Sequence, residues 1–235
     1  MSDTEEDEVQ NKSVKISVVG EPSTGKSTLC ARYLGGAAPG GGTAGAAVLA
    51  GQCLALRPPV PVSLCDVAGN SLGTGMLDNY LYASDIVLFV YDVTNLQSFD
   101  KLDSWLKKVK SVFEPEPRKP LLALFGNKSD LEHQRAVRLS VVQKFASEHL
   151  LESFKGSAKT GEMVSTALTS LVARLLGAKV KRAPGTTNGR SPQGASHSPP
   201  PLIHDDSSHS LIMNRKALRR VQRKAKASSS VCAVQ

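Results

Sequence analysis

The sequence predicts an α/β fold in which helices flank a mostly parallel sheet. Residues 85–93 and 120–127 form two nearly continuous apolar runs, which are typical of strands buried on both faces of a parallel sheet. Segments with apolar residues at helical spacing alternate with the strand-like runs, and this alternation favours helices on both faces. A glycine-containing loop at 20–25 joins the first expected strand to the first expected helix.

Local patterns predict the individual elements in order. Residues 14–19 alternate and then become apolar, which predicts the first strand, and a helical pattern follows the loop at 20–25. Residues 46–56 and 60–67 are expected to pair as a hairpin joined near Arg57-Pro58-Pro59, with Pro61 at a strand start. Apolar residues then recur at helical spacing in the segments 97–112, 140–150 and 162–176. A short strand-like segment precedes Ser157.

The composition divides the chain into three parts. Residues 1–12 are acidic and are expected to be flexible, residues 13–177 to form the folded domain, and residues 178–235 to be a disordered basic tail, since the tail is rich in Pro, Ser and Gly. Within the domain, residues 35–45 are too rich in glycine for a regular element and predict a mobile loop. Residues 66–75 are expected to form a second loop.

Charge is distributed unevenly along the 235 residues. The net charge is +8, but residues 178–235 contain eleven Lys or Arg residues and two Asp residues. The tail therefore carries the whole positive excess, and residues 1–177 lack the net positive charge that a nucleic-acid-binding domain is expected to carry. The domain is not predicted to bind nucleic acid specifically.

The cysteines and the N-terminus bear on the cellular compartment. The four cysteines show neither metal-ligand spacing nor a paired framework, which indicates a reducing environment; they are Cys30, Cys53, Cys65 and Cys232. The first ten residues are acidic and polar, unlike a secretory signal or a transit peptide. No apolar run approaches the roughly 18 residues that a membrane-spanning helix needs. We expect a cytosolic protein unless something anchors it.

Residues 20–27 fit the phosphate-loop pattern G-x-x-x-x-G-K-[ST]. In such a loop the backbone N–H groups and the following helix N-terminus face phosphate oxygens. Lys26 is expected to reach the outer phosphates, and the Ser27 hydroxyl to ligate Mg²⁺. The predicted phosphate-binding residues are Ser23, Thr24, Gly25, Lys26, Ser27 and Thr28. The alternative, an incidental glycine loop, fits less well because the loop lies between a predicted strand and a predicted helix.

The base is indicated by a second motif, Asn127-Lys128-Ser129-Asp130, at the carboxyl end of a buried strand, where ligands bind in open α/β sheets. The Asp130 carboxylate can accept two N–H donors from the guanine edge, and adenine offers no such pair. Ser157-Ala158-Lys159 follows a strand-like segment and can bring a backbone N–H to the guanine oxygen. The alternatives are an exposed turn for the first motif, and an ATPase or nucleotide kinase for the chain.

With these motifs in this order the chain resembles the small GTPases, and among them a divergent part of the Rab family. The resemblance covers residues 12–177 and the last four residues. It implies a P-loop small-GTPase fold with a six-stranded, mostly parallel sheet that binds GTP or GDP with Mg²⁺. By position, Thr43 and Asp66 join Ser27 as Mg²⁺ ligands, Thr43 also senses the terminal phosphate, and the Gly69 N–H contacts that phosphate.

Three positions depart from the family pattern. The first switch lacks the aromatic residue that commonly covers the guanine edge, and Tyr33 is expected to lie too early to replace it. Cys65 stands where Rab proteins usually have tryptophan. Asn70 stands where they usually have the glutamine that orients the attacking water, and its side chain is shorter by about 1.5 Å. We therefore predict slow, partner-dependent GTP hydrolysis; the alternative is that Gly69-Asn70 only shapes a turn and the loop compensates.

The C-terminal Cys232-Ala233-Val234-Gln235 fits C-a-a-X, and a terminal glutamine favours a farnesyl group on Cys232. A basic cluster precedes it, with Arg215, Lys216, Arg219, Arg220, Arg223, Lys224 and Lys226. One lipid chain and basic residues together give stable but releasable attachment to an anionic membrane surface. The alternative for the basic run is a nuclear-localisation signal or a nonspecific RNA-binding patch.

The resemblance implies a membrane-recruited switch in vesicle traffic. Its partners would be effector proteins, a guanine-nucleotide exchange factor, a GTPase-activating protein and a prenyl-binding chaperone. By analogy it would attach reversibly to the cytosolic face of endomembranes, either endosomal or at the ciliary or flagellar base. A second hypothesis is a GTP-binding scaffold that hydrolyses negligibly.

Overall fold

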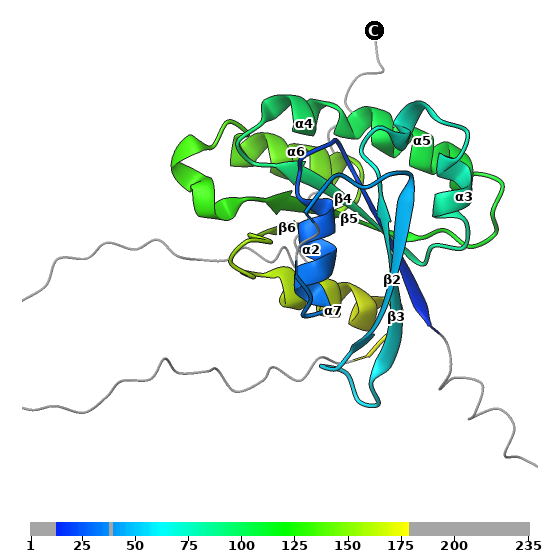
Figure 1. Cartoon of the computed structure of the whole chain (residues 1–235). Helices are drawn as coiled ribbons and strands as arrows, with labels where there is room; N and C mark the ends of the chain where they lie inside the picture. Colours follow the sequence, from blue (N-terminus) through cyan, green and yellow to red (C-terminus); the bar gives the residue numbers. More distant parts are fainter. Residues whose placement is uncertain (1–12, 38–39, 179–235) are drawn as a thin grey trace, which may run out of the picture. The chain divides into compact units, whose positions relative to one another are not determined.

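The computed structural model describes residues 13–37 and 40–178, and these contain a six-stranded sheet (Figure 1). The strands are β1 (Val14–Val19), β2 (Ala46–Cys53), β3 (Val60–Val67), β4 (Ile86–Asp92), β5 (Leu121–Asn127) and β6 (Glu152–Lys155). Their order is β2-β3-β1-β4-β5-β6, and only the β2–β3 pair is antiparallel. The predicted α/β class with a mostly parallel sheet is confirmed.

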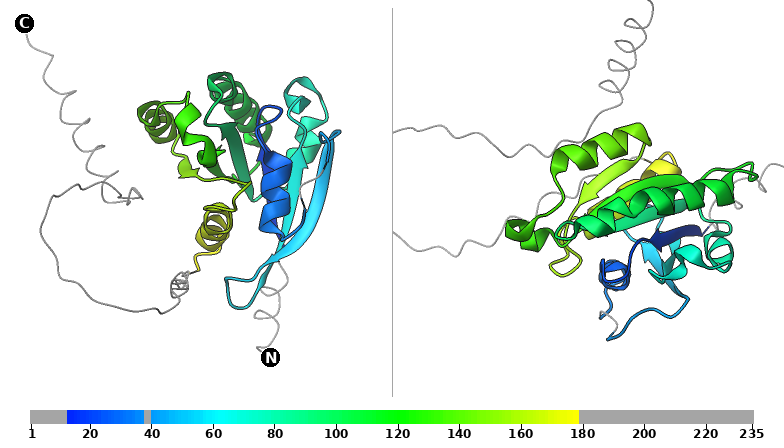
Figure 2. Two further views of the ribbon diagram at one scale, coloured as in Figure 1. Left: turned by 60° about the vertical axis from the view of Figure 1, so that its left-hand side comes forward. Right: turned by 90° about the horizontal axis from the view of Figure 1, so that it is seen from above.

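Helices cover both faces of this sheet (Figure 2). The α-helices are α2 (Lys26–Tyr33), α3 (Leu77–Leu81), α4 (Leu96–Asp100), α5 (Leu102–Phe113), α6 (Leu139–Glu148) and α7 (Val164–Leu175). Two short 3₁₀ helices, η1 (Ser71–Gly73) and η2 (Ser129–Gln134), follow β3 and β5. Core residues of α2 and α7 pack on one face, and those of α3, α5 and α6 on the other.

Strand β4 shows why a continuous apolar run was needed. All seven of its residues are buried. Successive side chains of a strand point to opposite faces, so Ile86 and Leu88 enter the core under α2 and α7, whereas Val87 and Phe89 enter the core under α5. Both faces of β4 are covered by helices, as the sequence pattern predicts.

Two local predictions need correction. The expected helix at 97–112 is two consecutive helices, α4 and α5, separated at Lys101, and α4 begins where the Asn95 side chain accepts a hydrogen bond from the Gln97 N–H. The expected loop at 66–75 begins later, because β3 continues to Val67 through its pairing with β2. Helix α3 was not predicted at all.

The predictions for residues 1–12 and for most of the tail, including its basic cluster and Cys232, lie outside the described residues. Within the described part of the chain, no helix is both long and apolar enough to span a membrane.

Candidate nucleotide-binding site

The loop between β1 and α2 has a backbone shape that requires glycine before α2. Gly25 precedes the helix with a φ of 89°, in the left-handed region. A Cβ atom at this position would lie 2.3 Å from the Nδ2 atom of Asn127. Gly25 therefore allows the loop both to turn into the helix and to approach the carboxyl end of β5.

The Lys26 side chain folds back over this loop. Its Nζ atom donates hydrogen bonds to the carbonyl oxygens of Gly20 and Glu21, at 2.9 and 2.8 Å. Lys26 is only 6% exposed, and burial lowers the pKa of its ammonium group while Asp66 and Glu21 oppose that shift. No ion pair of Lys26 occurs among the described residues. A buried cation that contacts only carbonyl groups is well suited to receive an anion, because burying an unpaired charge is costly.

Three oxygen-bearing side chains from separate parts of the chain meet beside Lys26. The Ser27 and Thr43 hydroxyl oxygens are 2.8 Å apart, and the Thr43 hydroxyl donates to Asp66 Oδ2 at 2.7 Å. Asp66 is 2% exposed, and its Oδ1 atom has no hydrogen-bond partner among the described residues. Hydroxyl and carboxylate oxygens are the donors that Mg²⁺ prefers. The structure thus brings together the three predicted Mg²⁺ ligands, and this donor set fits the ion.

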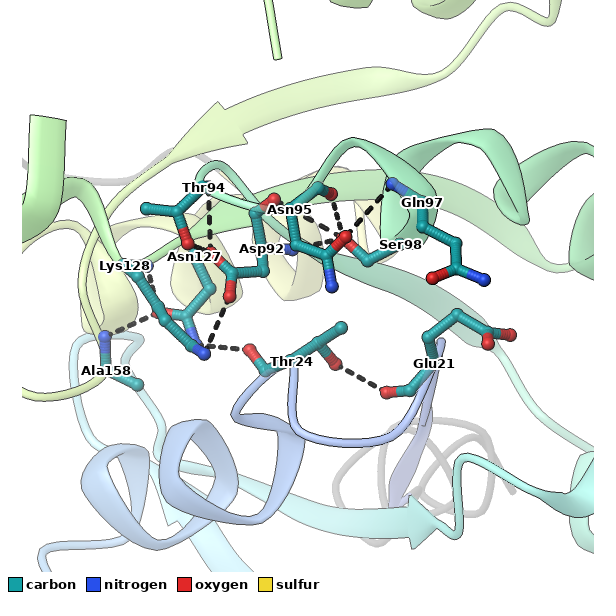
Figure 3. A network of polar contacts seen from close by, with 10 residues as sticks. All are labelled: Glu21, Thr24, Asp92, Thr94, Asn95, Gln97, Ser98, Asn127, Lys128 and Ala158. Carbon is teal, nitrogen blue, oxygen red and sulfur yellow. Dashed lines mark hydrogen bonds and ion pairs between the residues drawn. The ribbon is translucent and has the colours of Figure 1, made fainter. Parts of the chain in front are cut away.

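Asn127 connects this phosphate loop to the loops after β5 and β6 (Figure 3). Its Nδ2 atom donates to the Thr24 carbonyl at 2.8 Å. Its Oδ1 atom accepts from the N–H groups of Lys128 and Ala158, at 2.8 and 2.9 Å. All three contacts use one buried amide, so Asn127 fixes the separation between the phosphate loop and the predicted guanine loops.

The other predicted guanine-binding residues gather around Asn127. The buried Ser157 hydroxyl donates to Asp130 Oδ1 at 2.6 Å, which orients the carboxylate. Lys128 adopts a positive φ of 67° and forms an ion pair with Asp92, with 2.7 Å between Nζ and Oδ2. Lys159 is exposed. The structure therefore brings the two predicted guanine-binding motifs together.

The remaining predicted phosphate-loop residues occupy several environments. Ser23 is exposed and has a positive φ of 62°. The Thr24 hydroxyl donates to the Glu21 carbonyl at 2.9 Å, which tightens the loop. Thr28 is half-buried in the first turn of α2.

Comparisons with known proteins agree with this arrangement. A sequence model of the Ras family matches residues 15–177. The chain belongs to the Ras family of small GTPases. It is similar to the Ras-related protein Rab-28 of Caenorhabditis elegans, with 33% identity over 184 residues, or 76% of this chain and 73% of that protein. It is also similar to the Ras-related protein rab-39 of the same organism, with 32% identity over 158 residues, or 65% and 69% of the two chains.

The matches to the Ras family and to two Rab proteins confirm the expected Rab relationship. Membership of the family also implies the general chemistry of the site. Ras-family proteins bind guanine nucleotide with Mg²⁺ and have GTPase activity. The ATPase and nucleotide-kinase alternatives lose their support. The phosphate loop lies between β1 and α2, and the motifs that contain Asp66 and Asn127 lie at the carboxyl ends of β3 and β5.

The structure also shows where the residues that depart from the family pattern lie. Tyr33 packs against the core at the end of α2, so it does not replace the missing aromatic of the first switch. Cys65 is buried in β3. Asn70 is exposed at the start of η1.

The first switch has small side chains and borders a cavity. Residues 40–47 carry no side chain larger than threonine, and a cavity of about 400 Å³ lies between this segment and Ala31, Leu34 and Leu49.

Three contacts at the site were not predicted from the sequence. Arg32 of α2 donates from Nε to the Ala158 carbonyl at 3.0 Å and from a guanidinium nitrogen to the Lys159 carbonyl, which ties α2 to the last guanine loop. Asp92 pairs with Lys128, as described above. The third contact joins Glu21 to the Trp105 indole. Each contact involves at least one residue that lies outside the recognised motifs.

We expect Gly69→Ala to destabilise the folded protein by about 1–3 kcal/mol, the usual cost of overpacking. A Cβ atom at Gly69 would lie 2.2 Å from the Pro22 backbone nitrogen, so the segment after β3 would have to move away from the phosphate loop. Urea denaturation with GDP present measures the difference. Gly73→Ala is the matched control, because no atom lies within 4 Å of a Cβ at Gly73. Equal midpoints for the two variants would contradict the predicted clash.

We expect Asp92→Asn to lower the free energy of unfolding by about 1–2 kcal/mol near pH 7. Burial raises the pKa of Asp92, but hydrogen bonds from Lys128 and Thr94 outweigh burial and hold it below its ordinary value of 3.8. Because the pKa is lower in the folded state, the stabilisation is present above pH 3.8 and is lost as pH falls through the folded-state pKa.

Urea denaturation between pH 3 and pH 7 tests this prediction. The acid-induced loss of stability below about pH 4 should be smaller in Asp92→Asn than in the unaltered protein. Asp103→Asn is the control, because the Asp103–Lys107 pair lies on the exposed surface of α5. If Asp92→Asn and the unaltered protein lost stability in parallel, the ion pair would not be the source of the pH dependence.

Proposed function

We propose that this protein is a Rab-like switch that binds GTP or GDP with Mg²⁺ and recruits effector proteins to a membrane while GTP is bound. The observation that carries the proposal is the position of Thr43. This residue lies in the glycine-rich first switch, yet its hydroxyl contacts both Ser27 of the phosphate-loop helix and Asp66 at the end of β3. These hydrogen bonds attach the first switch to the other residues that are proposed to hold Mg²⁺. Switch loops of this kind become ordered when the terminal phosphate is bound.

Each motif has a proposed role in holding the nucleotide. Lys26 and the backbone N–H groups of residues 23–28 bind phosphate oxygens. Asp130 accepts two N–H donors from guanine, and the Ala158 N–H donates to the guanine oxygen. Lys128 lines the base site, held there by its ion pair with Asp92. Ser157 supports Asp130 through its hydroxyl.

Ser27, Thr43 and Asp66 are the residues that would hold Mg²⁺. Bound Mg²⁺ would offset negative charge on the phosphate oxygens. The Gly69 N–H would contact the terminal phosphate. The close approach of Gly69 to the phosphate loop at Pro22 supports this role. Loss of that phosphate would release both Thr43 and Gly69, which gives the switch its two states.

Hydrolysis is proposed to be slow without a partner. Asn70 carries the same amide as glutamine but is shorter by about 1.5 Å, and a misplacement near 1 Å costs on the order of a hundredfold. A GTPase-activating protein that supplies an arginine or a glutamine would restore the rate. The rival function is a GTP-binding scaffold with negligible hydrolysis, favoured by the same exposed, shortened side chain.

Membrane attachment is proposed to use the C-terminal tail. Farnesylation of Cys232 and the basic cluster at 215–226 would together give reversible binding to an anionic surface, aided by a prenyl-binding chaperone. We propose an endomembrane on its cytosolic side, endosomal or at the base of a cilium or flagellum. An exchange factor would load GTP there.

Identification of the co-purified nucleotide tests the proposal. The protein is purified with Mg²⁺ throughout and denatured, and the released nucleotide is identified by ion-exchange chromatography. A guanine nucleotide is the expected result. GDP would mean that the site selects guanine and that Asn70 still permits hydrolysis. GTP would favour the scaffold or a strictly partner-dependent switch. Adenine nucleotide, or none, would overturn the proposal.

A further inference from the structure

Glu21 connects the phosphate loop with two other parts of the molecule, the segment after β3 and helix α5. Its carbonyl oxygen accepts hydrogen bonds from Lys26 and from Thr24, at 2.8 and 2.9 Å. Its backbone also meets the segment after β3, since a Cβ at Gly69 would lie 2.6 Å from the Glu21 carbonyl carbon. Figure 3 shows the Glu21 carbonyl facing Thr24 and the carboxylate pointing away from it.

The carboxylate is held by a buried tryptophan of α5. Trp105 is 0% exposed, and its indole Nε1–H donates to Glu21 Oε1 at 2.9 Å. A buried indole N–H needs an acceptor, because an unpaired one is costly. Glu21 supplies that acceptor from a loop 84 residues earlier in the chain. The hydrogen bond therefore fixes the conformation of Glu21 from outside the loop.

A carboxylate in a phosphate loop also needs a fixed orientation. Anionic phosphates and the Glu21 carboxylate repel each other, and repulsion between charges weakens with distance. The indole N–H holds the carboxylate on the α5 side, away from Thr24. The Glu21 carbonyl then remains on the opposite side, where it receives Lys26. Glu21 thus contacts the Trp105 indole through its side chain and the Lys26 ammonium through its carbonyl.

We propose that Trp105 and Glu21 are positioning residues for phosphate recognition, acting through Lys26 and the loop backbone. This inference rests on the proposed function of the site as a GTP and GDP site. It predicts an effect confined to the outer phosphates: contacts to guanine come from Asp130 and Ala158, which are held by Ser157 and Asn127 and do not contact Glu21.

The test compares affinities for GDP, GMP and IDP in the full-length protein. Trp105→Phe keeps a buried aromatic ring but removes the indole N–H. It should weaken GDP binding about tenfold, or about 1.4 kcal/mol, because Glu21 would no longer be held where its carbonyl receives Lys26. GMP affinity should stay within about twofold, since GMP lacks the outer phosphate. The ratio of GDP to IDP affinity, which reports Asp130, should not change.

Four further variants, one of them a double substitution, separate positioning from simple destabilisation. Glu21→Ala should reproduce the loss, and combining it with Trp105→Phe should add little, because both remove the same bond. Glu21→Gln keeps an oxygen acceptor for the indole and should retain most of the GDP affinity. Val109→Ala, a buried change elsewhere on α5, controls for lower stability and should leave the ratio of GDP to GMP affinity unaltered.

Trp105 is the single tryptophan of the chain, so its fluorescence reports the same contact directly. Removal of nucleotide and Mg²⁺ should shift the emission of the unaltered protein, and Glu21→Ala should abolish this shift. If the unaltered protein binds GDP but Trp105→Phe binds GDP and GMP with unchanged affinities, or if GMP and GDP weaken equally, the positioning role is wrong. If the unaltered protein binds no GDP, the proposed function itself fails.

Discussion

Lys26→Ala is expected to weaken GDP and GTP binding by about a thousandfold. Lys26 is the only lysine of the phosphate-loop motif, and its ammonium is buried against two loop carbonyls. Removing one partner of a buried charge pair costs roughly 3–5 kcal/mol, because the other charge is left without compensation. Phosphate oxygens enclosed by this loop would lose that compensation.

The loss must be separated from unfolding of the loop. Lys26 also ties Gly20 and Glu21 together, so the variant is compared with the unaltered protein by circular dichroism after nucleotide removal. Competition with a fluorescent GDP analogue gives the affinity. Lys107→Ala is the matched control, since Lys107 is an exposed lysine of α5 and should leave affinity unaltered. Unchanged GDP binding in folded Lys26→Ala would contradict the phosphate-loop assignment.

Sequence patterns predicted most of the sheet because burial leaves a strong signal there. A strand with helices on both faces is apolar along most of its length. Strand β4 is apolar up to Asp92, and β5 up to Asn127. Helix α3 left no such signal. It has five residues, of which only Leu77 and Leu81 are buried, too few to establish a helical period. Its position depends on packing against α5 and β3.

The site divides in a similar way. Asn127, Lys26 and Asp66 belong to motifs whose spacing is set by the ligand, so the sequence alone places them in the site. Arg32 and Trp105 belong to no such motif. Trp105 lies in the segment 97–112, whose apolar residues predict only a helix, and the direction of its indole N–H depends on how α5 packs in the domain. Contacts of this kind join segments that are distant in the chain, and no local pattern records them.

Asn70→Gln is expected to raise intrinsic GTP hydrolysis by about a hundredfold, to near the ~10⁻⁴ s⁻¹ of the unaided family. The added methylene extends the amide by about 1.5 Å toward the reach that glutamine has. Asn70 is exposed at the start of η1, so a longer side chain meets no core packing there. The variant should fold and bind GTP as the unaltered protein does.

Single-turnover release of phosphate from bound GTP measures this effect, with GTP affinity measured alongside. Asn70→Ala is the matched variant, because it removes the amide altogether. Asn70→Ala and the unaltered protein could hydrolyse GTP at equal rates while Asn70→Gln is much faster. This result would mean that the shortened amide contributes nothing to hydrolysis and that rapid hydrolysis requires a partner. Equal rates for Asn70→Gln and the unaltered protein would mean that the loop after Gly69 moves to bring Asn70 within reach. The first outcome makes the lifetime of the GTP state a property of the activating partner, and the second makes it a property of the chain itself.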